Sequence, residues 1–163
     1  MEKPNGGDEE ETAVTNISSD YFFMSTRDEQ AKENPVLVML DEDTGDKYAR
    51  AAGRKGVGEE GANHWLVKYS QNELKAWGHT CGDDSKLILK SDGGSSITAF
   101  RECLGKFHGG IILPEKHARG ASQSNGKVER SCRTIREFTR VPKEQLEEKP
   151  AWRSRLTILL LNG

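Results

Sequence analysis

Three carboxylates stand where a metal-dependent reaction could use them. Asp20 lies inside an expected strand, between a serine and three aromatic residues, where an acid is costly unless it has a purpose. Asp92 follows a short expected strand and is bounded by glycines, which let a ligand approach the backbone. Glu129 lies one turn into the last expected helix. Strand ends and a nearby helix turn are where open α/β sheets assemble their sites.

The chemistry open to three converging carboxylates is metal-assisted. They repel one another and therefore need cations, and oxygen-only ligation selects the hard ions Mg²⁺ or Mn²⁺. Two such ions can activate a water or hydroxyl and stabilise the leaving oxygen of a phosphodiester. However, the chain has 26 Asp and Glu residues, most of which are solvated surface groups. For any one of the three, a capping or surface role is the better starting assumption, and spacing alone does not overturn it.

Other site chemistries find less support. The cysteines Cys81, Cys103 and Cys132 are widely spaced and form no CxxC pair, so free thiols are expected. His79 lies close to Cys81, but no second pair of ligands accompanies them, and a zinc site is not predicted. The glycine-rich segment 53–61 lacks the Gly-Lys-Ser/Thr ending of a phosphate-binding loop.

The elements that must position the carboxylates follow from hydrophobic patterning. The order is three strands, helix, strand, helix, strand and helix, which indicates an α/β domain with a mixed sheet. The segment 27–34 is polar and turn-like, and Pro142 is expected to end or kink the last helix. The expected strands are 17–24, 35–40, 47–52, 86–90 and 111–114, and the expected helices run from 62 to about 77, from a cap at Ser95 or Ser96 to Gly109, and from about Gln123.

Charge is distributed unevenly along the chain, although the net charge is only −2. Residues 1–60 contain fifteen Asp and Glu against seven Lys and Arg, whereas residues 101–140 contain nine Lys and Arg against four acids. A polyanion could dock on the basic second half, although an unevenly charged solvated surface fits equally well. No apolar run reaches the length of a membrane span, and the N-terminus does not resemble a secretory signal, so an intracellular protein without a membrane partner is expected.

The sequence around the carboxylates resembles that of retroviral-type integrases. The segment Asn125-Gly126-Lys127-Val128-Glu129-Arg130 is similar to the Asn-Gly-x-x-Glu-Arg signature of integrases from copia-type LTR retrotransposon polyproteins. Ser91-Asp92-Gly93 and the strand around Asp20 resemble the two aspartate strands of this Asp-Asp-Glu family. Asp92 and Glu129 are separated by 36 residues, near the roughly thirty-five typical of the family. The resemblance extends over about 17–140.

The resemblance implies a ribonuclease-H-like fold, a five-stranded mixed sheet flanked by helices. It implies that Asp20, Asp92 and Glu129 are catalytic and hold two Mg²⁺ or Mn²⁺ ions. The reactions would be DNA 3′-end processing and strand transfer, which together achieve DNA integration, with element ends and target duplex as partners. The expected setting is a homo-oligomer in the nucleus. The implied DNA-binding residues are Asn125, Lys127, Arg130 and Arg133, although for each basic residue a solvated helix face is an equal alternative.

The expected organisation is an acidic disordered leader over 1–16, an integrase catalytic core over 17–148 and an atypical tail over 149–163. The tail does not resemble the family's continuation, and the family's His-His-Cys-Cys zinc module is not found before the core. Three interpretations therefore stay open. They are a DNA strand-transfer core, a catalytically idle nucleic-acid-binding domain, and a nuclease with the ribonuclease-H-like fold.

Overall fold

The structure, a computed structural model, describes residues 14–58, 61–79, 86–116 and 122–147. Its centre is a five-stranded sheet in the order β3-β2-β1-β4-β5. β1 pairs with β2 and β2 with β3 antiparallel, whereas β4 runs parallel to β1 and to β5, so the sheet is mixed as predicted. The elements are β1 Thr15–Phe23, α1 Thr26–Ala31, β2 Pro35–Asp41, β3 Lys47–Ala51, α2 His64–Ala76, β4 Lys86–Ser91, α3 Ser95–His108, β5 Ile111–Lys116 and α4 Ser122–Glu147.

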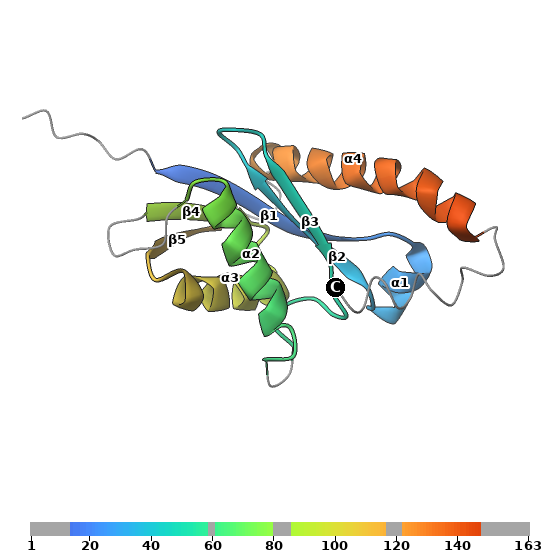
Figure 1. The fold of residues 1–163 in the computed structure, drawn as a ribbon, viewed down its shortest axis with the longest axis horizontal. Helices are drawn as coiled ribbons and strands as arrows, with labels where there is room; N and C mark the ends of the chain where they lie inside the picture. Colours follow the sequence, from blue (N-terminus) through green and yellow to red (C-terminus); the bar gives the residue numbers. More distant parts are fainter. Residues whose placement is uncertain (1–13, 59–60, 80–85, 117–121, 148–163) are drawn as a thin grey trace, which may run out of the picture.

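Helices cover both faces of the sheet. α2 and α3 lie on one side and α4 on the other, while α1 lies at the end of the sheet where β2 begins (Figure 1). β2 is buried along its whole length, which explains its unbroken apolar sequence. The predicted five-stranded mixed sheet flanked by helices is confirmed. No helix in the described part of the chain combines the length and apolarity that crossing a membrane requires.

Alternation along β1 divides the core between the two faces of the sheet. Ile17 and Tyr21 join the larger cluster under α2 and α3, which includes Phe100 and Leu104 of α3. Phe22 joins a smaller cluster with Val36, Val38, Val128 and Cys132, which attaches α4 to β1 and β2. Asp20 has the same parity as Phe22 and therefore belongs to the face covered by α4.

Several sequence-based boundaries need correction. The segment 27–34, expected to be a turn, contains most of α1, whose N-cap Ser25 accepts a hydrogen bond from the Asp28 N–H. The cap expected at Ser95 or Ser96 is wrong, because Gly94 is the N-cap of α3 and makes no side-chain cap bond. β1 begins at Thr15, inside the expected leader, whose residues 1–13 lie outside the described chain, as does the tail 149–163.

The last helix is longer than the sequence indicated. α4 begins at Ser122 and continues through Pro142 to Glu147, so of the two expectations for this proline, an end or a kink of the helix, the end is wrong. A proline removes one backbone donor and crowds the preceding turn, and a helix can absorb both by bending. Glu129 consequently lies about two turns into α4 rather than one.

A buried carboxylate closes the β2–β3 hairpin. Asp41 accepts hydrogen bonds from the backbone N–H groups of Asp43 at 2.9 Å and Thr44 at 3.2 Å, and His79 Nε2 lies 2.9 Å away. Burial by itself would raise the pKa of Asp41, but the hydrogen bonds and the His79 interaction together lower it. His79, considered above only as a weak zinc ligand, thus has a structural partner, and Cys81 lies outside the described residues.

An Asp41→Ala variant is expected to lose about 2 kcal/mol of unfolding free energy at neutral pH, because it removes the acceptor of two backbone N–H groups and of His79. The lowered pKa means that this stabilisation is present above the ordinary aspartate pKa and fades as the pH falls through the folded-state pKa. Urea denaturation at several pH values measures it. Asp43→Ala, at an exposed position of the same turn, is the control, and an equal loss in both variants would contradict the assignment.

Candidate active site

Asp20 occupies a position where the sheet opens. β1 pairs with β4 only from Thr15 to Ser18, although it continues along β2 as far as Phe23. Asp20 therefore lies just beyond the shared ladder, opposite Val38 of β2 and near the carboxyl end of β4. Its Oδ1 accepts a hydrogen bond from the Tyr21 N–H at 2.7 Å.

The electrostatic surroundings of Asp20 link it to both other predicted carboxylates. Its pKa is raised to about 6, first by burial, with further increases from the negative charges of Asp92 and Glu129. The Tyr21 N–H and the positive charge of Lys55 act in the opposite direction. The fold thus brings Asp92 and Glu129, both far from Asp20 in sequence, close enough for their charges to act on Asp20.

Asp92 directly follows β4 and precedes α3. Its carboxylate is exposed, and its Oδ1 accepts a hydrogen bond from the Gly94 N–H at 3.0 Å. Gly93 has a φ of +78°, which an L side chain rarely adopts, so glycine suits this strand-to-helix turn. The side chain is therefore held by its own turn, at the end of the strand that neighbours Asp20.

Glu129 comes from α4, on the covering side of the sheet. Its side chain is exposed, while Val128 and Cys132 on the same helix are buried against β1 and β2. The pKa of the Cys132 thiol is raised to about 12, first by burial and next by the negative charge of Asp20, with a smaller increase from Glu129 and a decrease from Arg136. Cys132 therefore stays a neutral thiol beside the carboxylates and is not a thiolate ligand.

The three carboxylates are neighbours but do not form one coordination sphere. Among the described residues, no group of three or more His, Cys, Asp or Glu side chains is arranged to hold a metal ion. The donor chemistry nevertheless suits Mg²⁺ or Mn²⁺, since all three groups are carboxylates and the negative charges of Asp92 and Glu129 both act on Asp20.

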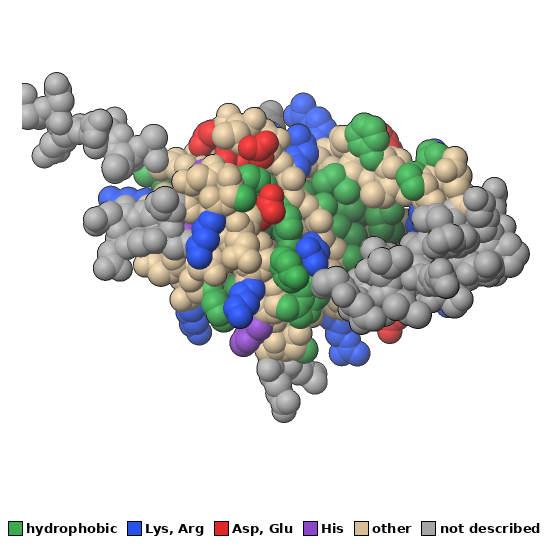
Figure 2. All heavy atoms as spheres, viewed as in Figure 1, with side chains coloured by type: hydrophobic (Ala, Val, Ile, Leu, Met, Phe, Trp, Pro, Cys, Tyr) green, Lys and Arg blue, Asp and Glu red, His purple; other side chains and the backbone are tan. Residues whose placement is uncertain are grey.

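The residues expected to bind DNA have different surroundings. Lys127 Nζ lies 3.3 Å from Glu42 Oε2, and Glu42 also contacts Lys90 Nζ at 3.4 Å and the Ser18 hydroxyl. Burial would raise the pKa of Glu42, but these partners lower it. Lys127 therefore ties α4 to the sheet, a function that sequence reasoning missed. Figure 2 shows acidic side chains around the β2–β3 turn next to basic ones where α4 begins.

Arg130 and Arg133 are exposed on α4, and no carboxylate among the described residues forms an ion pair with either, so both can meet a phosphate. Arg136 stacks over Phe22, with its guanidinium carbon 5.1 Å from the ring centroid. The backbone of Asn125 belongs to α4, but its side chain lies outside what the structure describes.

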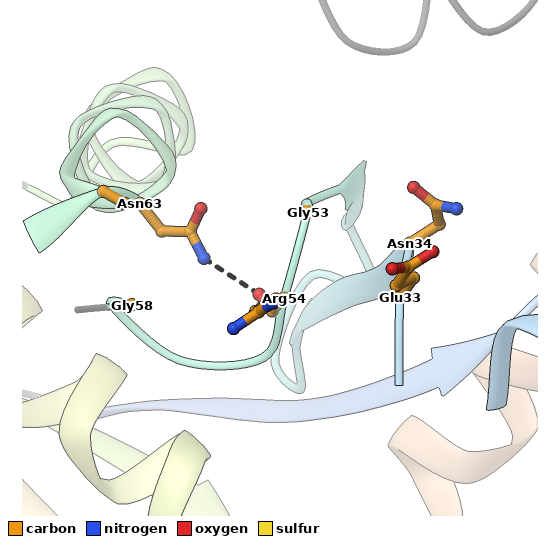
Figure 3. Close-up of a pocket in the computed structure, with 7 residues that line it drawn as sticks. Glu33, Asn34, Gly53, Arg54, Gly58 and Asn63 are labelled. Carbon is orange, nitrogen blue, oxygen red and sulfur yellow. Dashed lines mark hydrogen bonds between the residues drawn. The ribbon is translucent and has the colours of Figure 1, made fainter. Parts of the chain in front are cut away.

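A cavity of about 690 Å³ lies beside the loop between β3 and α2 (Figure 3). None of the three carboxylates lines it, so it is separate from the candidate active site. Its lining is both polar and apolar, and a hydrogen bond from the Asn63 side chain to the Arg54 carbonyl fixes one wall. The lining residues are Glu33, Asn34, Gly53, Arg54, Gly58, Ala62 and Asn63.

Comparison with known proteins identifies the fold. No family model matches the chain, and no curated protein matches it. Among solved structures, the simian T-cell lymphotropic virus intasome in complex with PP2A regulatory subunit B56 gamma is similar, with a TM-score of 0.58 and 14% identity over 83% of this chain. The chain spans 43% of that protein chain.

A second similar structure is the catalytic core domain of BIV integrase, with a TM-score of 0.51 and 19% identity. The alignment covers 82% of this chain and 74% of the BIV chain. At these identities the likeness concerns the fold, and it agrees with the observed strand order and flanking helices. The chain therefore has the ribonuclease-H-like fold of retroviral integrase catalytic cores.

Proposed function

We propose that this chain is a metal-dependent polynucleotidyl transferase core, the integrase core of a copia-type LTR retrotransposon. The observation that supports it best is the half-buried Asp20, whose pKa is raised to about 6 by burial and by the charges of Asp92 and Glu129. Asp20 and Asp92 lie at the opening of the β1–β4 ladder, and the charge of Glu129 acts on Asp20 from α4, on a fold shared with integrase catalytic cores. The Asn125 to Arg130 segment supports the narrower assignment to copia-type elements.

The proposed reactions are two phosphoryl transfers on DNA. In end processing, a water oxygen bonds to phosphorus, the bond to the 3′ oxygen breaks, and that oxygen takes the proton. In strand transfer, the new 3′-hydroxyl attacks a target phosphodiester in the same way. Divalent cations would supply charge stabilisation at the phosphate oxygens. Asp20, Asp92 and Glu129 would hold them, and Arg130 and Arg133 would bind neighbouring phosphates of the duplex.

The wider setting follows from the same proposal. The substrates are the element's DNA ends and a target duplex, which places the protein in the nucleus as a homo-oligomer. The core would extend over 17–148. The similar simian viral structure is an intasome, a multi-component assembly, which supports an oligomeric setting for this chain as well. Gel filtration with and without a short duplex tests the oligomeric state.

One observation favours a second candidate, a catalytically idle nucleic-acid-binding domain. The three carboxylates do not form a single ligand set in the described structure. Such a domain would keep the exposed arginines of α4 and bind DNA without cleaving it.

Cleavage and strand transfer of short DNA duplexes with Mn²⁺ separates the two candidates. The transferase proposal predicts activity that Asp92→Asn reduces by at least about 100-fold, because the site loses a charge that stabilises the transition state through the cation. Asp46→Asn, at an exposed hairpin position, is the matched control and should keep the activity. A parent protein that binds DNA but never cleaves it, with binding unaffected by Asp92→Asn, contradicts the transferase proposal and supports the idle domain.

A further inference from the structure

The loop of residues 53–58, between β3 and α2, is fixed at several points. The Gly56 N–H donates a buried hydrogen bond to the Tyr21 hydroxyl at 3.2 Å. The Asn63 side-chain amide donates to the carbonyls of Arg54 at 2.9 Å and Gly56 at 3.1 Å, and the first of these bonds is drawn in Figure 3. Asn63 also donates its backbone N–H to Val57. Loop 53–58 is thus bound to β1 and to the start of α2.

Gly56 also brings the loop against the start of α3. Its φ is +79°, and a Cβ at this position would lie only 3.1 Å from the Ser96 carbonyl oxygen. A glycine is therefore needed both for the backbone conformation and for the close approach. Ser96 is the second residue of α3, the helix that follows the Asp92 turn. The loop consequently spans the gap between β1 and the strand end that presents Asp92.

Lys55 stands between the two anchored residues Arg54 and Gly56. Its Nζ lies 4.9 Å from the centroid of the Phe23 ring and 5.8 Å from that of the Tyr21 ring, two β1 side chains on the sheet face opposite to that of Asp20. The side chain is exposed, and within the described ranges no carboxylate forms an ion pair with it. Its positive charge acts on Asp20, so an ammonium group lies within electrostatic reach of the candidate active site, with donors available to an anion.

We propose that Lys55 binds a phosphate of the nucleic-acid substrate at the carboxylate site, held there by loop 53–58. The inference rests on the proposed function for its ligand class, a phosphodiester. A phosphate entering beside three carboxylates meets strong repulsion, and a fixed ammonium offsets part of it. Because the loop is anchored and the Lys55 stem packs near two aromatic rings, less freedom is lost on binding than for a lysine on a mobile loop.

The neighbouring Arg54 provides a matched control. It is exposed, belongs to the same loop and has the same charge, but it lines the separate cavity. Replacing Arg54 by Ala tests the loss of one positive charge from the loop. Replacing Lys55 by Ala removes the positive charge at residue 55 itself, so comparison with Arg54→Ala shows whether the position of the charge matters. Lys55→Arg keeps a positive charge at residue 55.

The experiment measures binding of a fluorescent DNA duplex by anisotropy over a range of salt concentrations, without divalent cations. Lys55→Ala is expected to weaken binding about tenfold and to reduce the slope of log Kd against log salt by about one, as for one lost phosphate contact. Lys55→Arg should keep the slope, and Arg54→Ala should keep both affinity and slope. In Mn²⁺-dependent cleavage, Lys55→Ala should raise KM.

Each outcome bears on the inference separately from the proposed function. An unchanged slope in Lys55→Ala, or an equal loss in Arg54→Ala, overturns the assignment of Lys55 even if the parent cleaves DNA in an Asp92-dependent way. If the salt slope of the parent depends on Lys55 but the parent never cleaves DNA, the phosphate-binding role of Lys55 is supported and the transferase function is contradicted. A parent that does not bind DNA overturns both.

Discussion

An Asp20→Asn variant is expected to lose Mn²⁺-dependent cleavage by at least about 100-fold and, at the same time, to unfold less readily than the parent. The activity falls because a metal-binding charge is removed. The stability rises because Asp20 is largely buried and is repelled by Asp92 and Glu129. Asparagine keeps an oxygen that can accept the hydrogen bond from the Tyr21 N–H, so the substitution removes the charge and little else.

The sign and pH window of this stability gain follow from the pKa of Asp20. Folding raises it from an ordinary value of 3.8 to about 6, so the folded protein holds the proton more tightly than the unfolded chain. The carboxylate therefore destabilises the fold increasingly as the pH rises from about 4 to about 6, and fully above that range. The full penalty is at most about 3 kcal/mol.

Urea denaturation of the parent and Asp20→Asn at pH 8 and at pH 4 measures this penalty. The variant should be the more stable protein at pH 8, and the difference should nearly vanish at pH 4. Because the comparison is between variants, the opposite pH dependence of Asp41 cancels. Asp46→Asn, an exposed control, should match the parent at both pH values. An Asp20→Asn protein that is less stable than the parent at pH 8 would show that the charge is compensated in the fold.

Divalent cations are expected to raise the melting temperature of the parent markedly. A cation bound only by the folded protein stabilises it by about 2.7 kcal/mol at a concentration one hundred times its Kd. For a chain of this size the corresponding shift is about 5–10 °C. The cation would relieve the repulsion among Asp20, Asp92 and Glu129, so the effect should depend on these three groups.

Thermal unfolding with increasing Mn²⁺ or Mg²⁺ checks the dependence. The shift should shrink strongly in Asp20→Asn and in Glu129→Gln. Glu137→Gln removes an exposed glutamate from the same helix and should leave the shift unchanged. Equal shifts in all these variants would mean that the ions act on the general surface charge instead.

Much of the fold was accessible from the sequence because long elements have strong patterns. The apolar run from Pro35 predicts a strand buried on both faces, and β2 is such a strand. The order of strands and longer helices is confirmed as well. The six-residue α1 escaped prediction because it is too short to show a helical period, and it depends on its Ser25 cap. The N-cap at Gly94 escaped prediction because it depends on the turn before α3, in which the Gly94 N–H donates a hydrogen bond to the Asp92 carboxylate.

The candidate site likewise contains residues that the sequence could predict and residues that it could not. Asp20, Asp92 and Glu129 could be proposed because strand ends and a signature segment mark them in the sequence. Lys55 could not, because its place near Asp20 depends on the hydrogen bond that Asn63 donates to the Gly56 carbonyl and on the one that the Gly56 N–H donates to the Tyr21 hydroxyl, and no local pattern encodes either. The pairing of Lys127 with Glu42 likewise joins residues far apart in the chain. Contacts of this kind are decided by tertiary packing.

The central claim is that Asp20, Asp92 and Glu129 jointly bind divalent cations. Anomalous diffraction from crystals grown with Mn²⁺ tests it most directly, because the anomalous signal locates the ion itself. If the three carboxylates form one cation site, an anomalous peak is expected at the opening of the β1–β4 ladder, about 2.0–2.2 Å from oxygens of all three. Crystals that contain Mn²⁺ on other surface acids but show no peak among these three would contradict it.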